Sequence, residues 1–124
     1  MEWWGQSVLD RSAAADTPDQ VKPVRAVSLQ RLLAGYERVN LIHMDVQGVE
    51  YDVLKSAIDL VDERVETLII GTHGKQIEKD LRTMLLSHHW IPNCDFTLSE
   101  INLTPYGSIP FGDGLQIWEN YRLV

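Results

Sequence analysis

The stretch Asn40-Leu-Ile-His-Met-Asp45-Val-Gln-Gly48-Val-Glu-Tyr51 decides the fold of this chain. It begins as an apolar run, reaches an acid at Asp45 and passes through Gly48 into an amphipathic segment. A buried parallel strand followed by a helix has this pattern, and it delivers a carboxylate to the sheet edge where ligands bind. The stretch therefore predicts an α/β domain with a strand over Leu41–Asp45.

The rest of the chain continues this alternation. The predicted elements are a short strand over Val24–Ser28, a helix over Leu29–Tyr36 with Ser28 as N-cap, the strand over Leu41–Asp45, a helix of about three turns from Val49 to Val61, a strand over Val65–Ile70, a helix from Ile77 to Leu85, and strands over Phe96–Ser99 and Leu115–Leu123. We expect residues 1–23 to be irregular and residues 24–124 to form the domain. The first two long strands should be parallel, and the last two an antiparallel pair at the sheet edge.

Composition narrows the class of protein. The chain has 124 residues, of which 44% are hydrophobic and 23% charged, as expected for one small globular domain. A net charge of −7 argues against a nucleic-acid partner or an anionic membrane surface. Cys94 is the single cysteine, so a reducing compartment such as the cytoplasm is predicted. We find no signal peptide and no apolar run long enough to span a membrane.

Several side chains have alternative interpretations. Trp3 and Trp4 either cover an apolar face of the domain or contact a substrate or partner. His88 and His89 end a predicted helix, where an imidazole interacts favourably with the helix dipole, and we favour this over a metal-binding role. His43, Asp45, His73 and Cys94 are metal-ligating residue types, but no pair of them has a recognised spacing, so no metal site is predicted.

The central motif resembles the signature of the FkbM family of methyltransferases. Asn40 stands where the family often has Asp, and His43 where it often has Lys. Further segments that resemble the family are Trp3–Ser7, Ile69–Gly74 and Asp113–Asn120. The resemblance implies a Rossmann-like fold and transfer of a methyl group from S-adenosylmethionine to a hydroxyl of a small-molecule acceptor, such as a sugar or secondary metabolite.

The same resemblance suggests site residues. Asp45, Gln47 and Gly48 are candidates for contacting the cofactor, and Glu50, Thr72 and His73 for contacting the substrate. Asp45 and His73 follow neighbouring strands, about 4.8 Å apart, so both could face one crevice and one of them take the hydroxyl proton. The alternatives are that Asp45 caps the next helix, His73 shapes a turn, Gly48 serves backbone geometry and Glu50 interacts with the helix dipole.

One departure from the family pattern bears on the whole chain. Class I methyltransferases cradle the cofactor with a glycine-rich turn, and no Gly-x-Gly-x-Gly pattern precedes residue 40. We therefore expect this chain to correspond to the C-terminal part of such an enzyme and to be inactive alone. The edge of the strand at Leu41–Asp45 should then be open, and either a homodimer forms through it or Val24–Ser28 covers it. The rival interpretation is a non-catalytic α/β module for oligomerisation or partner binding.

Overall fold

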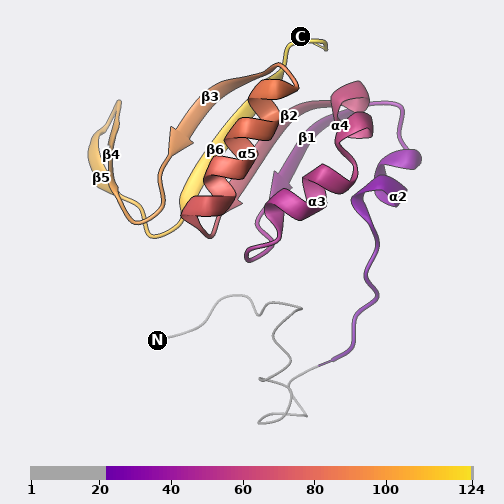
Figure 1. The fold of residues 1–124 in the computed structure, drawn as a ribbon, viewed down its shortest axis with the longest axis horizontal. Helices are drawn as coiled ribbons and strands as arrows, with labels where there is room; N and C mark the ends of the chain where they lie inside the picture. The colour runs from indigo at the N-terminus through magenta and orange to yellow at the C-terminus, as the bar shows by residue number, and fades with distance from the viewer. Residues whose placement is uncertain (1–21, 124) are drawn as a thin grey trace.

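The computed structural model describes residues 22–123, so the predictions made for Trp3, Trp4 and the segment before residue 22 lie outside it. Helices and strands are interspersed in the first part of the described chain, and four strands follow one another at its end (Figure 1). The elements are α2 (Leu29–Ala34), β1 (Val39–Met44), α3 (Glu50–Ser56), α4 (Ile58–Arg64), β2 (Val65–Thr72), α5 (Lys75–Ser87), β3 (Trp90–Phe96), β4 (Ile101–Thr104), β5 (Gly107–Pro110) and β6 (Gly114–Asn120).

Four strands form a mixed sheet in the order β1-β2-β6-β3. β1 and β2 are parallel, whereas β6 is antiparallel to both β2 and β3. It follows that β1, β2 and β3 run in one direction and that β6 alone is reversed. The predicted parallel first pair and antiparallel last pair are confirmed, although β6 lies inside the sheet and β3 forms its edge.

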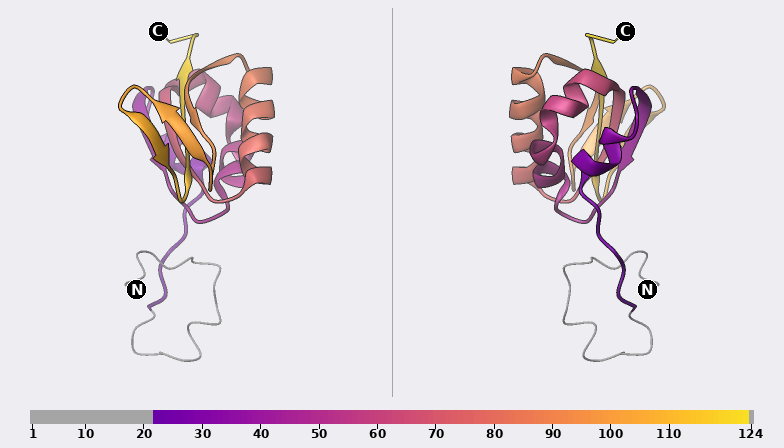
Figure 2. Two further views of the ribbon diagram at one scale, coloured as in Figure 1. Left: turned by 90° about the vertical axis from the view of Figure 1, so that its left-hand side faces the viewer. Right: turned by 90° about the vertical axis from the view of Figure 1, so that its right-hand side faces the viewer.

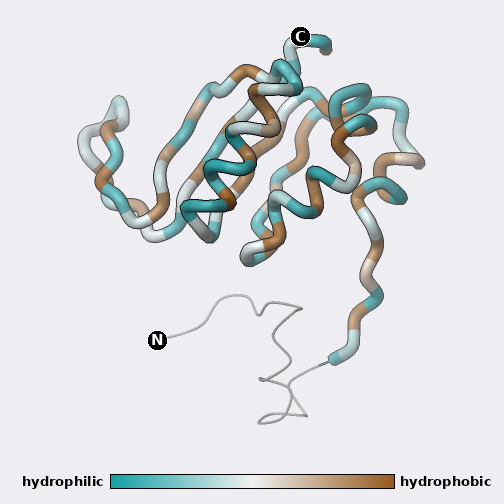
Figure 3. The backbone as a smooth tube through the Cα atoms, in the orientation of Figure 1, coloured by the Kyte–Doolittle hydropathy of each residue, from teal (hydrophilic) through white to brown (hydrophobic). Residues whose placement is uncertain are grey.

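The hydrophobic core lies between this sheet and one layer of helices. Helices α3, α4 and α5 cover one side of the sheet (Figure 2), and the β4–β5 hairpin extends beyond its β3 edge (Figure 1). Leu68 and Ile70 of β2 are buried beneath the helices, and α5 contributes Leu81 and Leu85. The hydropathy of α5 changes sign along its length, as expected for a helix with one buried face (Figure 3). Each such side chain contributes about 1.5–3 kcal/mol when fully buried.

Strand β6 adds polar side chains to this core. Gln116, Trp118 and Asn120 are fully buried. The indole of Trp118 donates to Oε1 of Gln116 at 2.9 Å, and the amide of Gln116 donates to the Glu78 carbonyl at 3.2 Å. Asn120 donates to the Val65 carbonyl at 2.8 Å. A buried amide is costly unless it is paired, so these bonds tie β6 to α5 and β2 in one register.

The predicted three-turn helix after Gly48 is wrong, because the segment is broken into α3 and α4. Ala57, between them, has φ −130° and ψ 19°, which is not helical. The Ser56 hydroxyl donates to the Val53 carbonyl at 2.7 Å, a side-chain bond that competes with regular helix geometry. Leu54 and Val61 still reach the core, so the apolar spacing is satisfied by two short helices.

The predicted strand over Val24–Ser28 is also wrong, since this segment is exposed and has no strand partner. It therefore leaves the outer edge of β1 uncovered within residues 22–123, where Leu41 is 50% exposed. Ser28 does cap α2, because its hydroxyl accepts from the Arg31 amide at 3.2 Å. The predicted N-cap is confirmed.

The strand predicted over Phe96–Ser99 lies earlier, at Trp90–Phe96. The alternation of residues is irregular there, and Pro92 argues against a strand within a sheet. Proline is nevertheless tolerated on an edge strand, and the pairing register shifts between Pro92 and Cys94. The β4–β5 hairpin was not predicted at all; Gly107, with φ 112°, follows its turn. None of the helices in the described part of the chain is long and apolar enough to cross a membrane.

Candidate functional site

The carboxyl ends of β1 and β2 bring Asp45 and His73 together. The parallel register pairs Met44 with Ile70, so the residues that follow both strands meet at one edge of the sheet. Oδ1 of Asp45 lies 3.1 Å from Nε2 of His73. Gly71 leaves room for this approach, because a Cβ there would lie 3.3 Å from Cγ of Asp45. The two side chains therefore lie in contact at this edge of the sheet, as predicted. Their catalytic roles stay a prediction.

Glu50 contacts the other nitrogen of the same imidazole. It is the first residue of α3, it is fully buried, and its Oε1 lies 2.7 Å from Nδ1 of His73. The backbone amides of Val46 and Gly48 also donate to this carboxylate, at 3.3 and 3.2 Å. Its place in the first helical turn agrees with the helix-dipole interpretation. The contact with His73, distant in sequence, was not predicted.

The turn between β1 and α3 has a left-handed backbone. Gln47 has φ 55° and Gly48 has φ 101°. A Cβ on Gly48 would meet nothing within 4 Å, so backbone conformation rather than close approach of a neighbour favours glycine there. The turn also directs the Gln47 amide toward His73, with 3.4 Å between Nε2 of each side chain.

Thr72, predicted to contact substrate, is turned into the interior. It is fully buried, and its hydroxyl donates to Oε1 of Glu78 at 2.7 Å. The Leu98 amide donates to the same oxygen at 2.8 Å. Gly114 packs so closely that a Cβ there would collide with both Glu78 and Thr72. The Thr72 hydroxyl is therefore committed to the protein, and its substrate role stays a prediction.

Asp113 is a further member of the site that was not among the predicted residues. It precedes β6, it is exposed, and its Oδ2 lies 3.8 Å from Nε2 of His73. Its place could have been inferred from the predicted direction of the last strand, since an antiparallel strand begins where its parallel neighbours end. Asp45, Glu50, His73 and Asp113 are called the His73 cluster below.

The His73 cluster is rich in hydrogen-bond acceptors, because three carboxylates surround one imidazole. Within residues 22–123, the ion pairs of Asp45, Glu50 and Asp113 all involve His73 and none involves Lys or Arg. Asp45, Glu50 and His73 also offer ligand atoms within 4.8 Å of one another, close enough for one divalent ion. His43 and Cys94 do not belong to that group. The prediction of no metal is not tested by this geometry.

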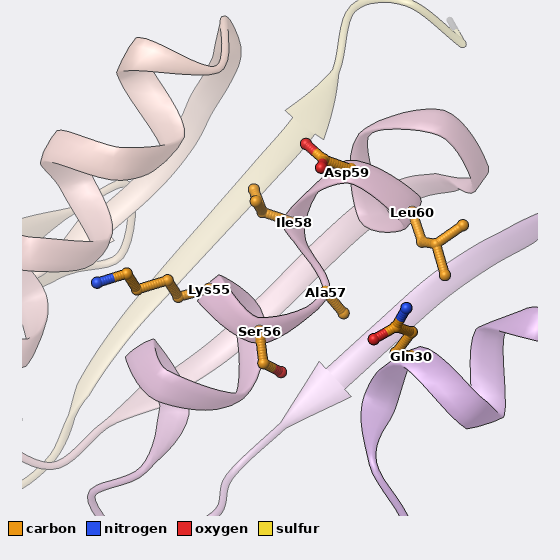
Figure 4. Close-up of a pocket in the computed structure, with 7 residues that line it drawn as sticks. All are labelled: Gln30, Lys55, Ser56, Ala57, Ile58, Asp59 and Leu60. Carbon is orange, nitrogen blue, oxygen red and sulfur yellow. The ribbon is translucent and has the colours of Figure 1, made fainter.

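A separate hollow lies at the junction of α3 and α4 (Figure 4). It is lined by Gln30 and residues 55–60 and measures about 100 Å³. Ligand pockets usually measure about 300–1,000 Å³. None of the His73 cluster lines this hollow, so it offers no cofactor site connected with those residues.

Comparisons with known proteins give the context of this geometry. Residues 4–98 match a family model described as the methyltransferase FkbM domain. A stretch of 57 residues is 35% identical to a protein of Jannaschia sp. (strain CCS1) named "Putative methyltransferase". The match covers 46% of this chain and 20% of the length of that protein. No solved structure matches the chain.

Proposed function

Since this chain belongs to the FkbM methyltransferase family, we propose that it carries the acceptor side of an active site. The reaction we propose is methyl transfer from S-adenosylmethionine to a hydroxyl of a small molecule or sugar. The observation that carries the proposal is the 3.1 Å approach of Asp45 to His73 at the carboxyl ends of two parallel strands. Ligands of open α/β sheets bind at that edge.

The two side chains suit activation of a hydroxyl. An alcohol is a poor nucleophile until a positioned base removes its proton. In this proposal Nε2 of His73 takes the proton, and Asp45 accepts a hydrogen bond from the N–H that results. The His73 side chain is partly shielded from solvent, being 13% exposed. The Asp45 side chain is 55% exposed, so a molecule that accepts the methyl group can reach it.

The cofactor would supply the electrophilic methyl group. Residues 22–123 do not by themselves fit it, because the amides of Val46 and Gly48 are already bonded to Glu50. We propose that the side chains of Asp45 and Gln47 reach the cofactor and that its cradle comes from other residues of a complete enzyme.

The strand directions support a Rossmann-like arrangement for residues 24–124. β1, β2 and β3 run the same way, and β6, which lies between β2 and β3, is reversed. β6 and β3 therefore form the antiparallel edge pair expected for a class I methyltransferase. We propose that these residues form the C-terminal part of such a domain.

Two measurements test the function. The first is calorimetric titration of the chain with S-adenosylmethionine, and the second is transfer of labelled methyl by an enzyme form that binds the cofactor. His73→Ala should lower turnover by about 10²–10⁴-fold, the usual contribution of a general base. Asp45→Asn should also lower turnover, because it removes the negative charge beside the protonated ring. His43→Gln is the matched control, because His43 is exposed on β1 and outside the His73 cluster. Full turnover in both variants would reject the catalytic roles.

The open edge of β1 supports a second proposal, the homodimer. Unpaired strand edges are ready templates for another chain. β1 has no partner on its outer side within the described residues, and Leu41 is 50% exposed there. Sedimentation should detect a dimer that dissociates when Leu41 is replaced by Lys. A monomer at high concentration would exclude it. A dimer that does not bind the cofactor would favour the non-catalytic module instead.

A further inference from the structure

Glu50 is the buried member of the His73 cluster, and the proposed reaction gives it no task. It is fully buried and lies at the start of α3, beneath the imidazole. A buried carboxylate must be paired, and this one has three donors: the amides of Val46 and Gly48 and the His73 ring. The two amides hold the carboxylate in place, so the direction of its bond to the ring is set by the backbone.

We propose that Glu50 is a positioning residue that fixes the tautomer of His73. An ionised carboxylate can only accept hydrogen bonds, so the 2.7 Å contact requires that Nδ1 of His73 carry the hydrogen. In a neutral imidazole the other nitrogen, Nε2, then has the lone pair. Glu50 therefore presents Nε2 as the proton acceptor.

The donor beside Nε2 agrees with this role, because the side-chain amide nitrogen of Gln47 lies 3.4 Å from Nε2 and can only donate a hydrogen bond. Nε2 also faces the exposed carboxylates of Asp45, at 3.1 Å, and Asp113, at 3.8 Å, which can accept from it once it carries a proton. Nδ1 faces the buried carboxylate of Glu50. Nδ1 is thus turned toward the protein interior, and Nε2 toward the carboxyl ends of β1 and β2, where the proposed methyl-accepting molecule binds. When the hydroxyl proton passes to Nε2, the O–H bond breaks and an N–H bond forms, and Asp45 accepts from that new N–H.

The meaning of this arrangement for catalysis rests on the proposed function, but the tautomer is a property of the free chain. The full chain labelled with ¹⁵N can be studied by two-bond ¹H–¹⁵N correlation spectra, at a pH where the ring is neutral. We expect the pattern of an imidazole protonated at Nδ1 in His73. Glu50→Ala should abolish this preference, whereas Glu50→Gln should retain it, because the amide oxygen also accepts from Nδ1.

His88 provides an internal control, since its Nδ1 lies 2.6 Å from Oδ2 of Asp62 at the far end of the sheet. Its signals should not change in Glu50→Ala. Conversely, Asp62→Ala should alter His88 and leave His73 unchanged. Protonation of His73 at Nε2 in the wild-type chain would overturn the inference. The wild-type spectrum decides the question even if Glu50→Ala does not fold.

A kinetic measurement separates positioning from a structural role. In an enzyme form that transfers methyl groups, Glu50→Ala should lower kcat about 100-fold or more, and Glu50→Gln should restore part of that loss. The KM of the acceptor should change little. Equal kcat in Glu50→Ala and wild type would overturn the positioning role. If the tautomer is found but wild-type enzyme transfers no methyl group, the proposed function fails and the tautomer assignment stands.

Discussion

Two histidine–carboxylate pairs lie at opposite ends of the same sheet, and their surroundings differ. At the carboxyl ends of β1 and β2, His73 bonds Glu50 and Asp45. At the other end, Nδ1 of His88 lies 2.6 Å from Asp62. The same Asp62 accepts from the Trp90 indole at 2.7 Å and lies 3.7 Å from the guanidinium of Arg122.

The difference is in the balance of donors and acceptors. Each oxygen of Asp62 has a donor, and Arg122 supplies a cation, so that group is complete within the protein. In the His73 cluster, three carboxylates share one imidazole, and two of them are more than half exposed. Polar groups satisfied internally contribute to stability, whereas unsatisfied exposed acceptors are available to a ligand. Residues at the two ends should therefore respond differently to substitution.

The largest contrast should come from removing one acid at each end. Asp62→Ala leaves the Trp90 indole and His88 without their acceptor and should lower the free energy of unfolding by about 2–4 kcal/mol. Asp45→Ala should change it by no more than about 0.5 kcal/mol, because Asp45 is exposed. Urea denaturation measures both values. Equal losses would contradict the division between a structural and a functional end.

Replacing the cation Arg122 should have a smaller effect on the free energy of unfolding. The Arg122 guanidinium donates to the His88 carbonyl at 2.5 Å and to Oδ1 of Asn120 at 3.2 Å. Arg122→Gln should destabilise the chain by about 1 kcal/mol, since the side chain is partly solvated and its ion pair is screened. The loss should be lower in the Asp62→Asn background, which a double-mutant cycle would detect. Strict additivity would mean that Arg122 acts independently of Asp62.

The smallest effect concerns acid stability. Arg38 donates to Glu66 at 2.6 Å, and this bond, with a further one from Asn40, lowers the pKa of Glu66 below its ordinary value of 4.5. A lowered folded-state pKa stabilises the protein above the unfolded-state pKa, and this contribution is lost as the pH falls through the folded-state value. Arg38→Gln should raise the pKa of Glu66 and reduce this loss in acid. Carboxyl ¹³C shifts would show no change if the pair were not formed.

Local sequence patterns predicted the strands that are buried on one face. The apolar runs at Leu41–Asp45 and Val65–Ile70 and the alternation after Leu115 correspond to β1, β2 and β6. Because adjacent parallel strands must end together, the meeting of Asp45 with His73 also followed from the sequence. These features depend on periodicity and on sheet geometry, both of which can be read from short segments.

The features that were missed depend on tertiary context. β3 alternates poorly and contains Pro92, so its strand conformation comes from pairing with β6. The break at Ala57 interrupts a continuous apolar pattern. The bond from Glu50 to His73 spans two elements, and Glu50 could satisfy the helix dipole without any such partner. Neither propensity nor spacing contains information about such contacts.

The hairpin of β4 and β5 has a consequence for engineering. β3 and β6 pair directly with each other, and the hairpin between them forms a separate two-stranded sheet. Its turn is highly exposed, with Tyr106 at 94%. The length of chain joining β3 to β6 is therefore not dictated by the four-stranded sheet. A peptide tag or a fluorescent reporter placed next to Tyr106 would leave the register of the larger sheet intact.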